Sequence, residues 1–157
     1  MSAPAALERH VVTATPEATR RLGEALARVS EPGDVLALWG ELGAGKTQLA
    51  KGFGTGLGVV ETVNSPTFIL MAEYAGRLPL FHVDLYRLAG PDEAVGGGLL
   101  DERQVAGVTL IEWPERLGNA LPPGRLDVRI EGTGDEPRRI VLRAGDARHA
   151  RYLEAVG

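Results

Sequence analysis

Apolar residues gather in short runs along the chain, and the spacing within the runs predicts strands and helices in alternation. The runs at 35–39 (VLALW) and 108–111 (VTLI) are almost wholly apolar, as is typical of strands buried on both faces of a parallel sheet. The segments expected to form strands are 10–14, 35–39, 67–74, 78–84, 108–111, 126–130 and 140–142.

Helices are expected between several of these strands. Thr15, Pro16 and Glu17 have the pattern of a helix start: an N-cap hydroxyl, a proline at the first helical position and an acid in the first turn. Further helices are expected at 46–57 and 147–155, and short helices around a loop at 88–104. The alternation predicts an α/β sandwich with a mainly parallel sheet flanked by helices and a late antiparallel hairpin. We expect a single domain over 1–157, with residues 1–9 frayed.

Composition narrows the possible functions of this 157-residue chain. It has no cysteine, which excludes thiol catalysis and disulfides. Its net charge of −4 argues against a self-sufficient nucleic-acid-binding protein. No apolar run approaches the roughly 20 residues of a membrane span, and the start lacks the pattern of a signal peptide. We therefore expect a cytoplasmic protein without membrane association.

The strongest motif is GELGAGKT at 40–47, which matches the phosphate-binding pattern G-x-x-x-x-G-K-[ST]. It follows an apolar strand and opens a helix, as that pattern requires. Glycines let backbone N–H groups face phosphate oxygens, Lys46 reaches the β- and γ-phosphates, and Thr47 binds Mg²⁺. Only two lysines, Lys46 and Lys51, occur among the seventeen basic residues. The motif predicts a fold like that of P-loop NTPases.

Two acids stand at the ends of predicted strands, Asp84 after 80–83 and Glu112 after 109–111. Ligands of α/β sheets bind at this carboxyl edge, and a phosphate loop needs an acid for its magnesium. The sequence leaves the two roles open. Our hypothesis is that Glu112 coordinates Mg²⁺, directly or through water, while Asp84 orients the attacking water and is the second candidate ligand.

Ser65 and Thr67 lie between the loop helix and the next strand. In phosphate-loop switches a hydroxyl at this place senses the γ-phosphate, so both are candidate switch residues. An ordinary turn followed by a strand-opening threonine is an equally good interpretation. His82 lies in an apolar run and is interpreted as a supporting core histidine.

Four blocks taken together resemble the bacterial TsaE (YjeE) family. They are GELGAGKT at 40–47, NSPTF at 64–68, HVDLYRL at 82–88 and IEWPERLG at 111–118. The resemblance implies a small phosphate-loop ATPase with weak intrinsic activity, using ATP and Mg²⁺. It also implies two protein partners, TsaB and TsaD. TsaD transfers the threonylcarbamoyl group to adenosine 37 of tRNA, and tRNA meets the ATPase only indirectly, through the complex.

The resemblance further implies roles for particular residues. Asp84 is essential for hydrolysis, Glu112 completes the magnesium site, Trp113 lies beside the nucleotide, and the Thr15 region approaches adenine. Lys46 and Asp84 are the expected catalytic residues, and Thr47, Glu112 and Asp84 the expected metal ligands. The residues expected to bind nucleotide are Thr15, Glu41, Leu42, Gly43, Ala44, Gly45, Lys46, Thr47, Gln48 and Trp113.

Two other functions stay open from the residues alone. A small-molecule kinase of the phosphate-loop type fits the length, with 96–98 (GGG) as a hinge. A non-enzymatic factor whose assembly is gated by ATP is the third interpretation. A GTPase is disfavoured, because the chain has no N-K-x-D motif. The basic C-terminal stretch from Arg138 to Arg151 is either a solvated face or a surface for tRNA or an acidic partner.

Overall fold

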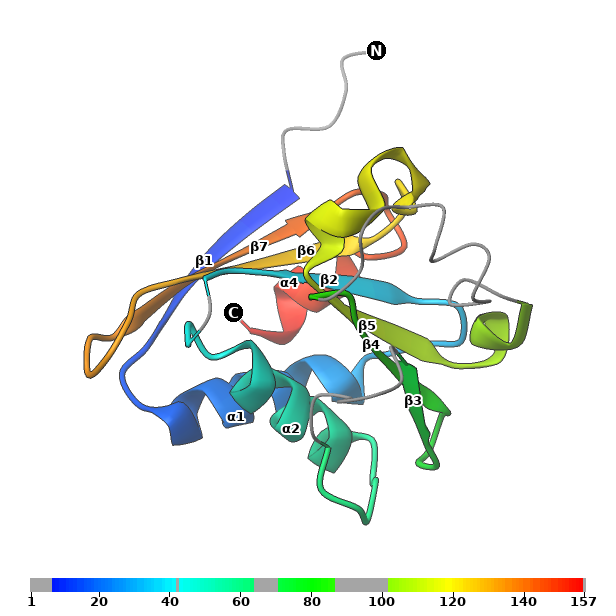
Figure 1. Cartoon of the computed structure of the whole chain (residues 1–157), viewed down its shortest axis with the longest axis horizontal. Coiled ribbons are helices and arrows are strands. Elements are labelled where there is room, and N and C mark those ends of the chain that lie inside the picture. Colours follow the sequence, from blue (N-terminus) through cyan, green and yellow to red (C-terminus); the bar gives the residue numbers. More distant parts are fainter. Residues whose placement is uncertain (1–6, 42, 64–70, 87–101, 157) are drawn as a thin grey trace.

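A computed structural model describes residues 7–41, 43–63, 71–86 and 102–156 (Figure 1). Their strands form one sheet in the order β1-β7-β6-β2-β5-β4-β3. The strands are β1 (Leu7–Thr13), β2 (Val35–Trp39), β3 (Met71–Tyr74), β4 (Leu80–Asp84), β5 (Val108–Glu112), β6 (Leu126–Glu131) and β7 (Arg138–Ala144). The helices are α1 (Pro16–Arg28), α2 (Lys46–Gly56) and α4 (Arg151–Ala155), with two 3₁₀ segments, Glu102–Ala106 and Pro114–Ala120.

The centre of the sheet is parallel and its margins are antiparallel. Strands β6, β2, β5 and β4 run in the same direction, whereas β7, β1 and β3 run against their neighbours. The predicted α/β class, the parallel centre and the late hairpin β6–β7 are confirmed. Because the four central strands share a direction, their carboxyl ends meet at one edge of the sheet.

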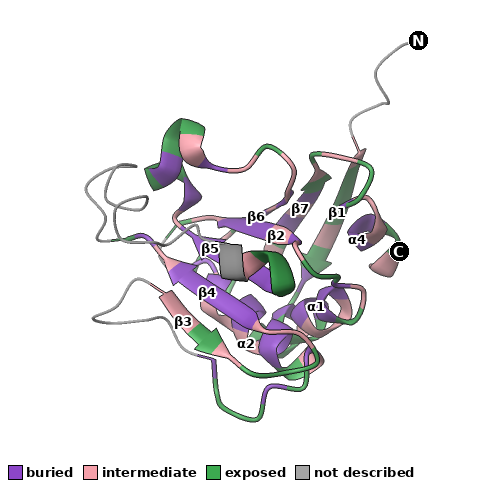
Figure 2. Ribbon diagram, turned by 90° about the vertical axis from the view of Figure 1, so that its right-hand side faces the viewer, coloured by how far each residue is buried: buried purple, intermediate pink, exposed green. Residues whose placement is uncertain are grey.

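Helices α1 and α2 lie side by side on one face of the sheet, and the 3₁₀ segment Pro114–Ala120 lies on the other (Figure 1). The larger apolar core fills the space between these helices and the strands, and α4 adds Tyr152 and Leu153 to it. Figure 2 shows the burial concentrated in the central strands and on the inner sides of the helices. The start of α2 is thereby held against the sheet.

Glycine allows α1 and α2 to touch through their backbones. A Cβ atom at Gly52 of α2 would lie 1.9 Å from the carbonyl oxygen of Arg20 in α1, which no side chain can tolerate. The glycine-rich sequence at 52–58 therefore serves helix packing at this position. The close contact fixes α2, and with it the loop that precedes α2, relative to α1.

A buried carboxylate, Asp34, ties the C-terminus to the start of β2. Its side chain is fully buried and accepts hydrogen bonds from Arg148 Nε at 2.9 Å, Tyr152 Oη at 2.5 Å, Arg151 Nη2 and the backbone N–H of Glu31. Burial raises the pKa of Tyr152, and its hydrogen bond to Asp34 does so further. We call this group the Asp34 cluster. It holds the C-terminal segment against the amino end of β2.

Some predicted boundaries were wrong. Strand β1 begins at Leu7, so residues 7–9 are paired with β7 and are not frayed. This edge strand has little buried surface, and its apolar signal is weak for that reason. The final α-helix spans only Arg151–Ala155, and 147–150 form turns that bring Arg148 and His149 towards Asp34.

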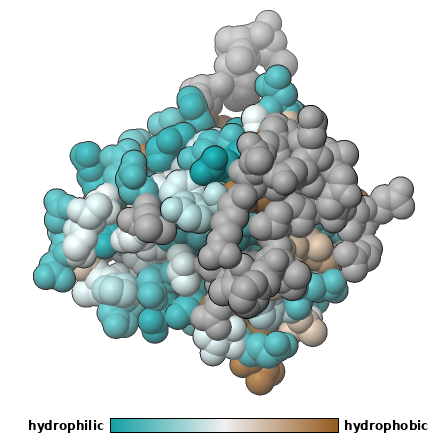
Figure 3. All heavy atoms as spheres, in the orientation of Figure 1, coloured by the Kyte–Doolittle hydropathy of each residue, from teal (hydrophilic) through white to brown (hydrophobic). Residues whose placement is uncertain are grey.

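On the face shown in Figure 3, the described residues are mainly hydrophilic, with an apolar spot at the lower edge, where the loop after α2 lies in Figure 1. Val60 in that loop is 98% exposed. Among the described residues, no helix combines the length and hydrophobicity that crossing a membrane requires.

Candidate functional site

The phosphate-binding motif forms the connection between β2 and α2. Gly45 has φ of 115°, in the left-handed region that favours glycine, and is the N-cap of α2. The N–H of Ala44 donates to the carbonyl of Glu41 at 3.0 Å, which closes a tight turn. The loop therefore places the positive end of a helix at the carboxyl edge of the sheet, an arrangement suited to anions.

Lys46 is 4% exposed and lies at the centre of this edge. Its Nζ donates to the carbonyl of Gly40 at 2.8 Å and lies 3.6 Å from the centroid of the Trp113 ring. Burial lowers the pKa of Lys46, and the negative charges of Glu112 and Asp84, among others, oppose that change. A buried cation faced by carboxylates is an electrostatic centre ready for a polyphosphate and a metal ion.

Trp113 has an unusual backbone. Its φ and ψ are 59° and 49°, and among the described residues it is the only non-glycine with positive φ. Such a conformation costs on the order of 1–3 kcal/mol. It turns the chain directly after β5, so that the indole lies against the ammonium of Lys46 and 5.0 Å from the ring of Tyr86. Trp113 therefore lies beside Lys46 of the loop, and its predicted contact with the nucleotide stays a prediction.

Asp84 and Glu112 lie opposite one another at the ends of neighbouring parallel strands, β4 and β5. The sequence placed both acids at this edge, and the structure brings them together there. Burial raises the pKa of Asp84, the nearby charge of Glu112 raises it further, and a hydrogen bond from the backbone N–H of Tyr86 opposes the change. Two facing carboxylates are unfavourable for the apoprotein and favourable for a divalent cation.

His82 supports Glu112 from within the sheet. Its Nε2 lies 2.6 Å from Glu112 Oε2, and both side chains are almost fully buried. The Nδ1 atom of His82 is buried and has no hydrogen-bond partner within the described parts of the chain. The interpretation of His82 as a supporting histidine agrees with this geometry. Nothing in the sequence indicated that His82 supports Glu112.

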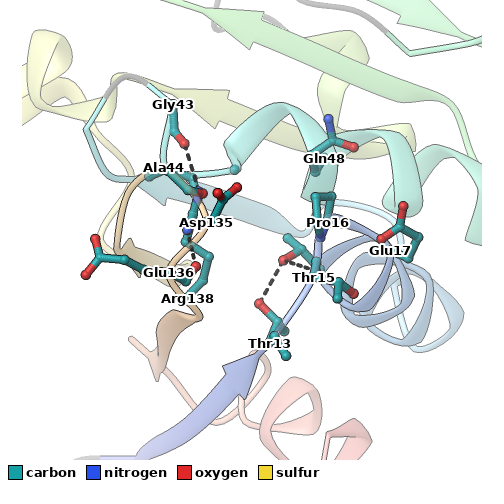
Figure 4. Close-up of a pocket in the computed structure, with 14 residues that line it drawn as sticks. Thr13, Thr15, Pro16, Glu17, Gly43, Ala44, Gln48, Asp135, Glu136 and Arg138 are labelled. Carbon is teal, nitrogen blue, oxygen red and sulfur yellow. Dashed lines mark hydrogen bonds between the residues drawn. The ribbon is translucent and has the colours of Figure 1, made fainter.

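A cavity of about 430 Å³ adjoins the loop on the side of α1 (Figure 4). Thr15 and Gln48, both predicted to bind nucleotide, line it together with the loop residues Gly43, Ala44 and Gly45. Thr15 also caps α1, since its Oγ1 accepts a hydrogen bond from Ala18 N at 3.1 Å. This cavity can accommodate the nucleoside end of a ligand whose phosphates lie on the loop.

The opposite wall of this cavity comes from the turn between β6 and β7, which no sequence pattern connects with the site. Gly134, Asp135, Glu136 and Arg138 line the cavity there. Local patterns could not indicate this, because it depends on β6 being the neighbour of β2. Knowledge of the strand order would have placed the hairpin turn at the same edge as the loop.

The other residues predicted to bind nucleotide, metal or the γ-phosphate lie in different places. Glu41 lies on the other side of the loop, where it lines a second cavity of about 320 Å³ with Trp39 and Trp113. Thr47 is the second residue of α2 and is half-buried. Leu42, Ser65 and Thr67 lie outside the described residues, so their predicted roles stay predictions.

Oxygen donors make this edge suitable for magnesium. The hydroxyl of Thr47 and the carboxylates of Asp84 and Glu112 are hard ligands, of the type that Mg²⁺ prefers. No group of three or more acidic, histidine or cysteine side chains suited to a metal occurs within the described parts of the chain. Mg²⁺ does not need one, since it commonly uses one or two carboxylates together with substrate phosphates and water.

The arginines of the C-terminal stretch do not share one face. Arg148 and Arg151 belong to the Asp34 cluster, and Arg138 points to the phosphate loop. Arg139 and Arg143 are exposed and pair with Glu131 and Glu8. The stretch therefore does not form one continuous basic face, and a contact of its exposed arginines with tRNA or an acidic partner stays a prediction.

Comparison with known proteins identifies the family. The family described as "Threonylcarbamoyl adenosine biosynthesis protein TsaE" matches residues 13–141. The tRNA threonylcarbamoyladenosine biosynthesis protein TsaE of Bacillus subtilis is 43% identical over 144 residues, which cover 90% of this chain and 89% of the relative. The protein of the same name from Treponema pallidum is 39% identical, over 83% of this chain and 97% of its own.

A solved structure is also similar. The crystal structure of Bacillus subtilis YdiB superimposes with a TM-score of 0.79 at 37% sequence identity and covers 98% of this chain and 97% of that one. The likeness therefore extends over nearly all of both chains. The chain belongs to the TsaE family of tRNA threonylcarbamoyladenosine biosynthesis.

Proposed function

We propose that this protein is the ATP-binding and ATP-hydrolysing component of the tRNA threonylcarbamoyladenosine modification complex, and that it supports turnover of a TsaB–TsaD transferase. The observation that carries the proposal is the burial of Lys46 at the start of α2, within the electrostatic reach of Asp84 and Glu112. A phosphate loop, a cation and two acids at one sheet edge are the parts that phosphoryl transfer from ATP requires.

In this proposal each residue has a defined task. The loop amides and Lys46 hold the β- and γ-phosphates, and Mg²⁺, when bound, neutralises charge that develops on the phosphate oxygens. Thr47 and Glu112 hold the metal, and His82 orients Glu112. Asp84 orients the attacking water. Thr15 and Gln48 lie where the nucleoside binds, and Trp113 covers the loop beside Lys46.

The first test is ATP hydrolysis by the purified protein, alone and with a purified TsaB–TsaD pair. We expect slow turnover alone and stimulation by the pair, both lost in Lys46→Ala. Unchanged turnover with the pair contradicts the assignment to this complex, and stimulation by a small acceptor in its place would identify a kinase. Full tRNA modification with a slowly hydrolysed ATP analogue would show that ATP only gates assembly.

A second experiment separates the two acids. Mg²⁺ is titrated into Asp84→Ala and Glu112→Ala in the presence of ATP, and metal affinity and turnover are measured separately. We expect Glu112→Ala to lose Mg²⁺ affinity and Asp84→Ala to retain it while losing turnover. A loss of metal affinity confined to Asp84→Ala means that the two roles are reversed.

A further inference from the structure

Arg138, the first residue of β7, reaches across the cavity to the phosphate loop (Figure 4). Its Nε donates to the carbonyl of Ala44 at 2.8 Å, and its Nη2 is 3.4 Å from the carbonyl oxygen of Gly43. The same guanidinium donates to the carbonyls of Gly134, at 2.9 Å, and of Glu136 in the β6–β7 turn. One side chain thus joins two segments more than ninety residues apart in the sequence.

These hydrogen bonds act on the orientation of the loop peptides. The two ends of a trans peptide unit are rigidly connected, so its C=O and N–H point in opposite directions. Because Arg138 holds the carbonyl of Ala44, the N–H of Gly45, which belongs to the same peptide unit, is held pointing away from Arg138. That amide belongs to the series of N–H groups that a phosphate loop directs at its ligand.

The charge of Arg138 has no carboxylate partner in an ion pair among the described residues. Its hydrogen bonds there all go to backbone carbonyls, and the carboxylate of Glu136 interacts with the guanidinium only through its charge, without an ion pair. Arg139, the next residue, is different. Its side chain is 77% exposed and contacts Glu131 on the surface. The chain therefore offers a matched control one position away.

We propose that Arg138 is a positioning residue for polyphosphate binding, which holds the Gly43–Gly45 backbone in its anion-binding conformation from the β6–β7 turn. This inference rests on the proposed function, because it assumes that the loop binds phosphates. According to this inference, Arg138 affects the binding of the phosphates of the ligand and not of its base. Lysine is a poor substitute, because only the planar guanidinium can donate to several carbonyls at once.

The test compares Arg138→Gln, Arg138→Lys and Arg139→Gln with the unmodified protein, using the full chain. Isothermal titration calorimetry with Mg²⁺ measures the binding of ATP and, separately, of inorganic tripolyphosphate. We expect Arg138→Gln to weaken both ligands by about tenfold or more, since charge-assisted hydrogen bonds are lost. Arg138→Lys should remain at least about fivefold weaker than the unmodified protein, and Arg139→Gln should stay within about twofold.

Four outcomes decide the matter. A weaker affinity for ATP but not for tripolyphosphate overturns the inference, because Arg138 would then act on the nucleoside. Full rescue by Arg138→Lys overturns it too, because charge alone would suffice. If the unmodified protein binds neither ligand, the proposed function itself fails, whereas equal binding by the unmodified protein and Arg138→Gln removes only this inference. Thermal unfolding without ligand identifies any variant that has lost its fold.

Discussion

The buried polar groups at the two ends of strand β2 differ in how far other groups of the chain satisfy them. At the amino end, the Asp34 carboxylate receives hydrogen bonds from two arginines, a tyrosine and a backbone N–H. At the carboxyl end, a lysine is buried and two carboxylates face one another. A histidine nitrogen there lacks a partner among the residues that the structure describes, and a tryptophan has a strained backbone. The first end satisfies its polar groups within the chain. The second gathers a buried cation, two facing carboxylates and a strained residue at one sheet edge, a combination that is common at functional sites.

The largest effect that follows concerns stability. Asp34→Ala leaves Arg148, Arg151 and Tyr152 without their shared acceptor, and breaking such a buried network costs about 3–5 kcal/mol. For a chain of this length the melting temperature should fall by roughly 6–20 °C. Circular dichroism during heating measures it. Glu154→Ala, which removes an exposed acid from α4, is the control, and a fall of under about 2 °C for Asp34→Ala would refute the expectation.

The second prediction concerns the other end of β2, where loss of a buried polar side chain should reduce activity and not stability. Lys46→Ala should reduce ATP turnover by about 10²–10³-fold, as the loss of a group that stabilises transition-state charge does. Its melting temperature should be unchanged or slightly higher, because the folded protein holds Lys46 in an environment that lowers its pKa. Lys51→Ala, the only other lysine variant, is the matched control. A large loss of stability in Lys46→Ala would show that the two ends do not differ as we describe.

The third prediction concerns the facing acids. Glu112→Gln keeps the shape of the side chain and removes one of two like charges that meet at the strand ends. Without metal, its free energy of unfolding should change by no more than about 1 kcal/mol, because the amide can still form a hydrogen bond with His82 and the repulsion from Asp84 is removed. With ATP, its response to Mg²⁺ should be lost. Differential scanning fluorimetry with and without Mg²⁺–ATP tests both statements, with Glu115→Gln as an exposed control; a destabilisation as large as that of Asp34→Ala would contradict them.

The smallest effect is a dependence on alkaline pH. The pKa of Tyr152 is raised in the folded protein above its ordinary value of 10.0, first by burial and then by Asp34. Its contribution to stability is therefore complete below pH 10 and declines as pH rises, because the unfolded chain releases the proton first. The decline approaches about 1.4 kcal/mol per pH unit.

Urea unfolding at several pH values between 9 and 11 measures this decline. Tyr152→Phe should unfold at lower urea throughout, yet its free energy of unfolding should vary less with pH. Tyr86→Phe, whose side chain is at the other end of the sheet and exposed, should follow the unmodified protein. Parallel curves for Tyr152→Phe and the unmodified protein would contradict the prediction.

Sequence patterns predicted those parts of the candidate site whose residues are close together in the sequence. The phosphate loop is eight consecutive residues, and the strand, loop and helix that carry it are adjacent in the chain. Asp84 and Glu112 were recognisable because each ends an apolar run, and parallel strands bring such ends together. The fold class followed from the same alternation of apolar runs.

Contacts between residues far apart in the sequence could not be predicted from it. Nothing near Arg138 shows that its partner is Ala44, and nothing near Asp34 shows that residues 148–152 cover it. The strained backbone of Trp113 was equally hidden, because a residue before proline is expected to be extended. Edge strand β1 was misjudged at its start, since its hydrogen bonds to β7 define it more than its side chains do.

The Asp34 cluster also constrains how the chain folds during its synthesis. Asp34 leaves the ribosome 114 residues before Arg148, and β2 is made long before its neighbours β5 and β6. Strand β2 gains its partners once β5 and β6 have emerged, but the carboxylate has no arginine to face until residues 148–151 follow. The domain should therefore not be complete before that segment has been made. A stop codon in place of Arg148 would deprive Asp34 of the Arg148, Arg151 and Tyr152 contacts on which its burial depends.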